Sequence, residues 1–208
     1  MWERLLVFDK SFCKNQMNSI QQIEIPFQFD TKRLLIRSFK VEDGPKLHKA
    51  LLESIVELRE YLWFLPWVGE EQTLASAEAR CLAASTNFSE RNDLAYLAFD
   101  KSSGRLLASV GLHRTDWSLP KTEVGFWVRS SETGKGYATE CVNALTDWAL
   151  NDLGAIRVDL VTSEHNMGSR AVAEACGFNL ESISQDDLEW PDGETKNICL
   201  YAKLCSTN

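Results

Sequence analysis

Three short apolar segments follow one another closely in the middle of the chain, and their spacing constrains the fold most. Leu94 to Phe99, Arg105 to His113 and Thr122 to Arg129 each predict a strand, with turn sequences at 102–104 and 118–120 between them. These connections are too short for a crossover helix, so we expect the three strands to pair as an antiparallel meander. A doubly wound dinucleotide-binding fold would alternate strands and helices from its start, and this pattern excludes it.

Further helical and strand-like patterns flank this meander. The sequence predicts a strand at 31–39, helices at 43–58 and 72–89, a helix at 136–153, a strand at 156–161, a short helix at 166–176, and a final hairpin of strands at 178–187 and 195–204. The order β-α-α-β-β-β-α-β-α-β-β indicates a mixed α/β sheet. With 208 residues the chain fits one domain, which we place at 31–208, and residues 1–30 are interpreted as an N-terminal extension because they show little periodicity.

The helix predicted at 136–153 has the clearest apolar stripe in the chain. The stripe contains Ala138, Cys141, Val142, Leu145, Trp148 and Ala149. The two earlier helices also have apolar residues at helical spacing. Leu47, Leu51, Leu52, Ile55 and Leu58 lie in the first, and Leu74, Ala77, Cys81 and Leu82 lie in the second.

Charge and hydropathy limit the classes of partner. Lys and Arg total 22 and Asp and Glu total 30, for a net charge of −8, which argues against nucleic-acid binding. An acidic surface suits a cationic partner such as an amine or a basic polypeptide. No apolar run approaches the roughly 20 residues that cross a bilayer, and the first residues lack a signal-peptide core. We therefore expect a soluble cytoplasmic protein without membrane contact.

The cysteines and histidines give little support to a metal enzyme or a Cys–His hydrolase. None of the six cysteines forms a C-x-x-C pair, so they are interpreted as reduced thiols. The three histidines, His48, His113 and His165, have no metal-ligand spacing. The sequence predicts no metal site.

The segment from Ser130 to Thr139 joins a strand directly to the amphipathic helix. Gly134 and Gly136 allow a tight turn and a close approach to a bulky anion, and the first-turn N–H groups of a helix attract negative charge. A phosphate or pyrophosphate cradle is one interpretation, and an ordinary strand–helix turn is the other. Neither common phosphate motif fits, because Gly136 follows Lys135 where a P-loop needs Ser or Thr, and the dinucleotide fingerprint needs a glycine at 139.

The surrounding residues resemble a known family. Glu123-Val124-Gly125-Phe126-Trp127-Val128, followed by Gly134-Lys135-Gly136-Tyr137-Ala138-Thr139-Glu140, resembles motif A of the GNAT acyl-CoA N-acyltransferases. The segment from Asn166 to Phe178 resembles the family pattern N-x-x-S-x-x-[VL]-x-E-x-x-G-F. The opening segments Thr31 to Arg37 and Leu62 to Trp67 look like the RimJ/RimL branch, which acetylates ribosomal proteins. The resemblance spans about 31–204 and implies the GNAT fold, a mostly antiparallel sheet flanked by helices.

The resemblance implies direct transfer of an acetyl group from acetyl-CoA to a primary amine, without a covalent enzyme intermediate. In this family the pantetheine arm pairs with the strand, a backbone N–H near Phe126 or Trp127 polarises the carbonyl, and the loop holds the pyrophosphate. The cofactor-binding residues so implied are Phe126, Trp127, Val128, Ser131, Thr133, Gly134, Lys135, Gly136, Tyr137, Ala138, Thr139, Asn166 and Arg170. Ser131 stands where the family usually has Gln or Arg, and Lys135 and Arg170 are candidates for the compensating charge.

Two catalytic residues follow from the same resemblance. Ser169 matches a serine proposed as the general acid for the leaving thiolate, and its alternative role is to help Asn166 cap the helix. Glu189 matches a catalytic glutamate before the final strand and is the predicted general base. Glu123 is its rival, because many relatives place a base on that strand.

The acceptor is expected to be a protein N-terminus. An α-amine, with a pKa of about 7.7–8.0, is roughly 10–20% free base at pH 7, whereas a lysine amine, at about 10.4, is under about 0.1%. No strong or buried base stands out, so the leading prediction is an acetyltransferase for the N-terminal α-amine of a basic protein such as a ribosomal protein, as a monomer or homodimer. The alternatives are a small-amine acetyltransferase and a non-catalytic acyl-CoA-binding module. Trp63, Phe64 and Trp67 either wall the acceptor groove or belong to the core.

Overall fold

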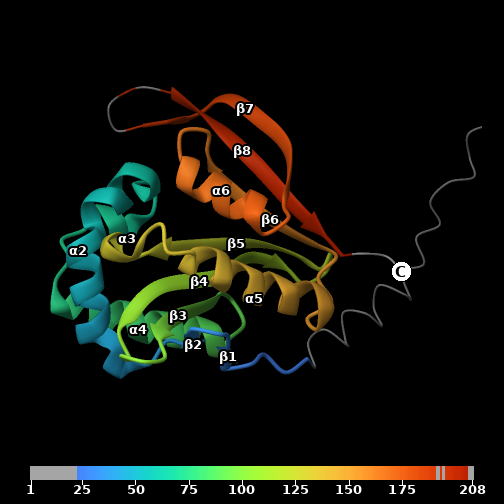
Figure 1. Ribbon diagram of the computed structural model, residues 1–208. Coiled ribbons are helices and arrows are strands. Elements are labelled where there is room, and N and C mark those ends of the chain that lie inside the picture. Colours follow the sequence, from blue (N-terminus) through green and yellow to red (C-terminus); the bar gives the residue numbers. More distant parts are fainter. Residues whose placement is uncertain (1–22, 191–192, 194, 206–208) are drawn as a thin grey trace, which may run out of the picture.

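The structure is a computed structural model that describes residues 23–190, 193 and 195–205. Its strands form one sheet in the order β1-β2-β3-β4-β5-β6-β8-β7 (Figure 1). The strands are β1 (Gln28–Asp30), β2 (Leu34–Ser38), β3 (Leu94–Asp100), β4 (Leu106–Asp116), β5 (Lys121–Val128), β6 (Arg157–Ser163), β7 (Asn179–Glu189) and β8 (Thr195–Leu204). Every described pair is antiparallel except β5 with β6, so the predicted meander and mixed sheet are confirmed.

Helices cover both faces of this sheet (Figure 1). They are the 3-10 turns η1 (Val41–Asp43) and η2 (Ser130–Glu132) and the helices α2 (Gly44–Leu62), α3 (Pro66–Gly69), α4 (Leu74–Ser89), α5 (Tyr137–Asn151) and α6 (Met167–Ala175). Leu47 and Leu51 of α2 share a buried cluster with Trp127, whereas Leu145 of α5 shares the opposite cluster with Val124. Successive side chains of β5 therefore pack alternately in the two buried clusters, because neighbouring residues of a strand point to opposite faces of the sheet.

Four of the six residues of the apolar stripe predicted for α5 are buried, and Ala138 and Trp148 are partly buried. Cys141, Val142, Leu145 and Ala149 are each 0% exposed. The predicted faces of the earlier helices were too broad: Leu82 of α4 is 56% exposed, and Leu52 of α2 is 55% exposed.

The sheet begins upstream of residue 31. Strand β1 pairs with β2, with Phe29 opposite Ile36, and Ile25 before it is only 7% exposed. Residues from at least Ile25 therefore pack on the domain. The rest of the predicted extension, residues 1–22, lies outside the described residues.

Strands β5 and β6 separate part-way along their length, and this separation positions the site. Among the described residues they pair only through Lys121–Glu123 and Arg157–Asp159. Beyond Glu123, strand β5 continues along β4, while β6 continues along β8. The edge of β5 from Val124 to Val128 is thus left without a strand partner on the β6 side.

The cysteines and the helices were also the subject of predictions from the sequence. The five described cysteines, 81, 141, 176, 199 and 205, are free thiols, as predicted, and the first four are buried. Within the described part of the chain, no helix has both the length and the apolarity to span a membrane.

Candidate active site

A cavity of about 710 Å³ opens where β5 and β6 diverge. Strands β4, β5 and β6 supply one wall, helices α2, α3 and α4 a second, and the start of α6 with Trp190 a third. Four of the candidate catalytic or cofactor-binding residues line it: Glu123, Phe126, Asn166 and Ser169. The fold thus brings the predicted acyl site on β5 together with the predicted acid on α6.

The loop before α5 has the conformation that its glycines predict. Gly134 and Gly136 have φ values of 72° and 77°, a region that only glycine enters readily. Gly136 is the N-cap of α5, and a Cβ placed on Gly134 would meet nothing within 4 Å. The backbone here is open to a ligand, with the unpaired first-turn N–H groups of α5 beside it.

The loop and the cavity are separate parts of one site. No residue from 130 to 139 lines the cavity, whereas Phe126 of the preceding strand does. A long cosubstrate could therefore place its phosphates on the loop and its reactive end in the cavity, with its arm along the free edge of β5. Trp127 and Val128 contribute backbone to that edge, while their side chains pack on opposite cores.

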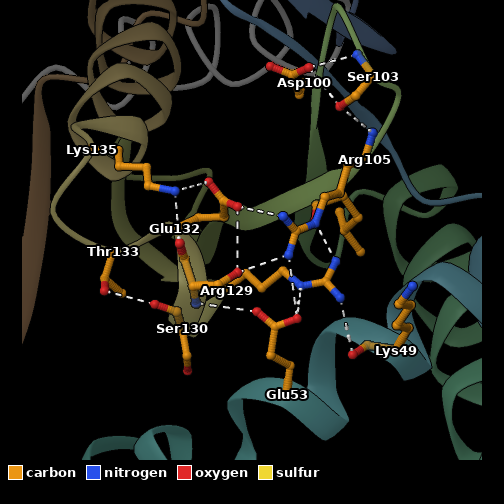
Figure 2. Close-up of polar contacts among 12 residues, drawn as sticks. Lys49, Glu53, Asp100, Ser103, Arg105, Arg129, Ser130, Glu132, Thr133 and Lys135 are labelled. Atoms are coloured by element: carbon orange, nitrogen blue, oxygen red, sulfur yellow. Dashed lines mark hydrogen bonds and ion pairs between the residues drawn. The ribbon is translucent and has the colours of Figure 1, made fainter.

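A network of ion pairs fixes the loop to α2 and β4 (Figure 2). Glu53 Oε2 accepts a 2.6 Å bond from Arg129 Nε, and Glu53 Oε1 accepts one from the backbone N–H of Ser131. Glu132 Oε1 accepts a 2.6 Å bond from Arg105 Nη1. Hydrogen bonds from Ser131, together with the guanidinium of Arg129, lower the pKa of Glu53 to about 2.

The two cations expected to compensate for Ser131 both have partners within the fold. Lys135 Nζ donates to Glu132 Oε2 and to the Ser131 carbonyl, each at 2.9 Å. Arg170 Nε donates to Tyr201 Oη at 3.1 Å. The guanidinium in contact with the Ser131 hydroxyl is that of Arg105, whose Nη2 lies 2.9 Å from Ser131 Oγ.

The guanidinium of Arg33, which lies between β1 and β2, also contacts the loop. Arg33 Nη1 donates to the Lys135 carbonyl at 2.9 Å, and its Cζ lies 4.3 Å from the centre of the Tyr137 ring. Arg33 Nε also donates to Glu140 at 2.6 Å. The sequence did not indicate this role for Arg33 or Arg105, because both lie far from the loop along the chain.

Asn166 caps α6, as predicted. Its Oδ1 accepts a 3.0 Å bond from the backbone N–H of Ser169. The capping group is therefore the Asn166 carbonyl oxygen, and the hydroxyl of Ser169 is not needed for it. That hydroxyl lies on a side chain that lines the cavity.

The two candidate bases differ in their surroundings. Glu123 is held by Arg114, whose Nε donates to Oε2 at 3.0 Å and whose Nη2 pairs with Oε1. Glu189 pairs through its backbone with Thr195, and its side chain lies outside what the structure describes. The next residue, Trp190, lines the cavity, so this end of β7 reaches the site.

Sequence reasoning missed His113 and Asp93, which both line the cavity. Their side chains pair through Nδ1 and Oδ1. The imidazole covers Gly111 and Gly125, since a Cβ on either would lie within 2.9 Å of a ring atom. In the described residues no group of three His, Cys, Asp or Glu side chains could hold a metal ion.

The aromatic segment divides between the two predicted roles. Phe64 and Trp67 line the cavity. Trp63 does not line it and instead packs edge-on against Trp190, with ring centres 5.8 Å apart. Trp67 also packs against the buried cluster beneath α2, and the acceptor-groove interpretation stays a prediction for Phe64 and Trp67.

The separated strands, the open loop and the adjoining cavity define a protein built to hold an acylated, phosphate-bearing cosubstrate beside a second substrate. The sequence profile of the "Acetyltransferase (GNAT) domain" matches residues 33–179. The chain belongs to this family and is an N-acetyltransferase. Acetyl-CoA is the cosubstrate of the family.

Relatives and solved structures agree with this assignment. YdaF of Bacillus subtilis (strain 168), provisionally named a ribosomal N-acetyltransferase, is 26% identical over 83% of this chain and 92% of its own. The RimL ribosomal L7/L12 alpha-N-protein acetyltransferase, solved with coenzyme A, superposes with a TM-score of 0.76 at 19% identity, covering 88% of this chain and 99% of its own. The ribosomal-protein-S5-alanine acetyltransferase from Vibrio fischeri gives 0.75 at 19%, covering 87% and 98%. At such identities the two structures establish the shared fold.

Proposed function

We propose that this enzyme acetylates the N-terminal α-amine of a protein, with a ribosomal protein as the first acceptor class to test. The observation that carries the proposal is the free edge of β5, which runs from the open loop to the cavity. The relatives named as ribosomal-protein acetyltransferases support the choice of acceptor. We also propose that the enzyme works in the cytoplasm, where acetyl-CoA and nascent proteins meet.

The chain's own residues supply the steps of the transfer. The amine nitrogen attacks the thioester carbonyl, and a backbone N–H near Phe126 or Trp127 stabilises the developing oxyanion. The C–S bond then breaks, and Ser169 gives a proton to the leaving thiolate and regains one from water. Glu189 takes the proton that the amine loses, directly or through water.

Among these bases, Glu189 remains our proposal over Glu123. The Glu123 carboxylate accepts a bond from Arg114 at each oxygen, and this pairing with a cation makes it a weaker base. An α-amine is partly free base near pH 7, so a single partly solvated carboxylate is a sufficient base to take its proton. A lysine acceptor would demand a stronger base.

A panel of amines tests this function. Acetyl-CoA consumption is followed with peptides that present a free α-amine, the same peptides with a blocked N-terminus and one lysine, and small amines such as a polyamine. The proposal expects turnover of the free-N-terminus peptides, abolished by blocking. Turnover of small amines alone would favour a small-amine acetyltransferase, and coenzyme binding without turnover of any amine would favour a non-catalytic module.

A further inference from the structure

Arg80 has an unusual environment in the cavity. It extends from α4 and lines the cavity together with Trp67 and Asp93. Its Cζ lies 3.2 Å from the centre of the Trp67 ring, so the guanidinium stacks on the indole. Its Nη1 is buried and makes no hydrogen bond to any described residue.

A partly buried guanidinium whose Nη1 has no partner among the described residues calls for an explanation. Buried charges are ordinarily paired, because the loss of hydration is otherwise uncompensated. Burial lowers the pKa of Arg80 to about 9, which leaves it a cation at pH 7. Stacking on Trp67 satisfies one face of the guanidinium but none of its N–H donors.

The described acidic groups around the cavity do not provide the partner. Asp93 pairs with His113, and Glu123 pairs with Arg114. Asp93 and Glu70 act on Arg80 only through space, since neither forms an ion pair with it among the described residues. Arg80 is thus a cation on the cavity wall whose buried Nη1 is not used by any described residue.

The cosubstrate's phosphates do not explain this cation. The loop that would hold them, residues 130–139, contributes nothing to the cavity lining. Arg80 instead shares the helical wall of the cavity with Phe64 and Trp67, where we place the acceptor. An anion at Arg80 would therefore belong to the acceptor.

We propose that Arg80 binds an anionic group, a carboxylate or a phosphate, on the acceptor that presents its amine to the cavity. The planar donor fork of arginine suits both anions, and the indole behind it holds the fork in place. This inference rests on the proposed function and narrows it, because the acceptor must carry an acidic or phosphorylated group near its amine. The remainder of a basic protein would lie outside the cavity, against the enzyme's acidic surface.

Matched peptides test the proposal directly. A peptide with a free N-terminal serine is prepared with Gln, Glu or phosphoserine at the second, third or fourth position. For wild type, kcat/KM for Glu or phosphoserine should exceed that for Gln by about tenfold or more at one of these positions. Comparison of the Glu and phosphoserine arms identifies which anion is preferred.

Arg80→Gln should abolish that preference and leave kcat/KM for the Gln peptide within about threefold of wild type. Arg80→Lys should keep only part of the preference, because an ammonium cannot form two parallel hydrogen bonds. Lys46→Gln, which removes a charge from an exposed position on α2, should keep all of it. Equal rates for Glu, phosphoserine and Gln peptides in wild type, or a preference that survives Arg80→Gln, would overturn the proposal.

Two further measurements distinguish a failure of this inference from a failure of the proposed function. If no peptide is acetylated, the proposed function fails, but calorimetric binding of the N-acetylated peptides in the presence of CoA still tests Arg80 by the same Glu, phosphoserine and Gln comparison. The melting temperature of Arg80→Gln should equal or exceed that of wild type, because a guanidinium whose Nη1 is buried without a partner is removed. A clear fall in melting temperature with no change in peptide preference would place the partner within the chain and refute the proposal.

Discussion

The imidazole of His113 is held by Asp93 and lies across Gly125, one residue before Phe126 on β5. Asp93 engages Nδ1, so Nε2 is the ring nitrogen directed over the two glycines. This places a titratable group on the floor of the cavity beside the proposed oxyanion site. The ring fits there because neither Gly111 nor Gly125 carries a side chain.

Alanine at Gly125 should disturb this arrangement specifically. Its Cβ would lie 2.9 Å from His113 Cδ2 and 3.1 Å from Nε2, so the ring must move. We expect a loss of about 1–3 kcal/mol in the free energy of unfolding and a raised KM for the peptide, both smaller in a His113→Ala background. Urea denaturation and steady-state kinetics of the two single variants and the double variant measure this. Equal effects in both backgrounds would show that His113 is not the contact.

The identity of the general base can be read from pH–rate profiles. A base must be deprotonated to act, so kcat/KM falls as the pH drops through its titration, and removing the base removes this limb. Glu189→Gln is expected to lower kcat/KM by about 10²–10⁴ and to flatten the acidic limb. Glu123→Gln and His113→Gln should retain the limb. A limb that persists in Glu189→Gln and disappears in one of the other two would transfer the role to that residue.

Ser169 and Asn166 offer a matched pair for the proposed acid. The cap uses the Asn166 side chain and the Ser169 backbone N–H, so Ser169→Ala should leave stability within about 0.5 kcal/mol of wild type while lowering kcat. Asn166→Ala should cost about 1 kcal/mol in the free energy of unfolding. Thermal denaturation and initial rates with saturating acetyl-CoA distinguish the two. An unchanged kcat in Ser169→Ala would leave the hydroxyl without a catalytic role.

The sequence predicted several structural features around the site because their signals are local. The two glycines, the stripe of α5 and the Asn166 cap each depend on residues within a few positions of one another, and the structure has all three. Local signals do not show which cationic side chains from distant parts of the sequence contact a loop. Arg33 and Arg105 could be assigned to it only once β2 and β4 were placed.

The pairing of His113 with Asp93 shows a different limit. The register of β3 and β4 places Leu94 opposite Leu112, which brings the next pair outward, Asp93 and His113, together. A shift between Ala98 and Phe99 moves that register by one residue. If the register were counted from the turn at 102–104 without this shift, His113 would be paired with the wrong residue across the two strands. The bulge has no clear signal in the residues that form it.

The open backbone of the loop predicts the effect of adding a side chain there. Gly134→Ala meets no protein atom within 4 Å, so its penalty to folding is the strain of a left-handed alanine, about 1–2 kcal/mol. A cosubstrate phosphate lying against the loop would meet the new methyl group, and we expect CoA affinity to fall at least tenfold. Calorimetric titration with CoA measures this, and circular dichroism verifies the fold. Unchanged affinity in a folded Gly134→Ala protein would show that the phosphates lie elsewhere.

The ion pair between Glu53 and Arg129 should make the loop's anchorage dependent on pH. Arg129 is 2% exposed, so Glu53→Gln leaves a buried guanidinium without its carboxylate. The usual penalty of about 3–5 kcal/mol is reduced here because the Glu53 side chain is 31% exposed, and we expect about 1–3 kcal/mol at pH 7.

The folded pKa of Glu53, about 2, lies below the ordinary value of 4.5, so this stabilisation is complete above pH 4.5 and is lost as the pH falls toward 2. Urea denaturation of wild type and Glu53→Gln from pH 7 downward should therefore show two curves that converge in acid. Glu57→Gln, an exposed position one turn further along α2, is the control and should track wild type throughout. A Glu53→Gln deficit that stays constant down to the acid unfolding of wild type would mean that the lost contact is not the ionised carboxylate.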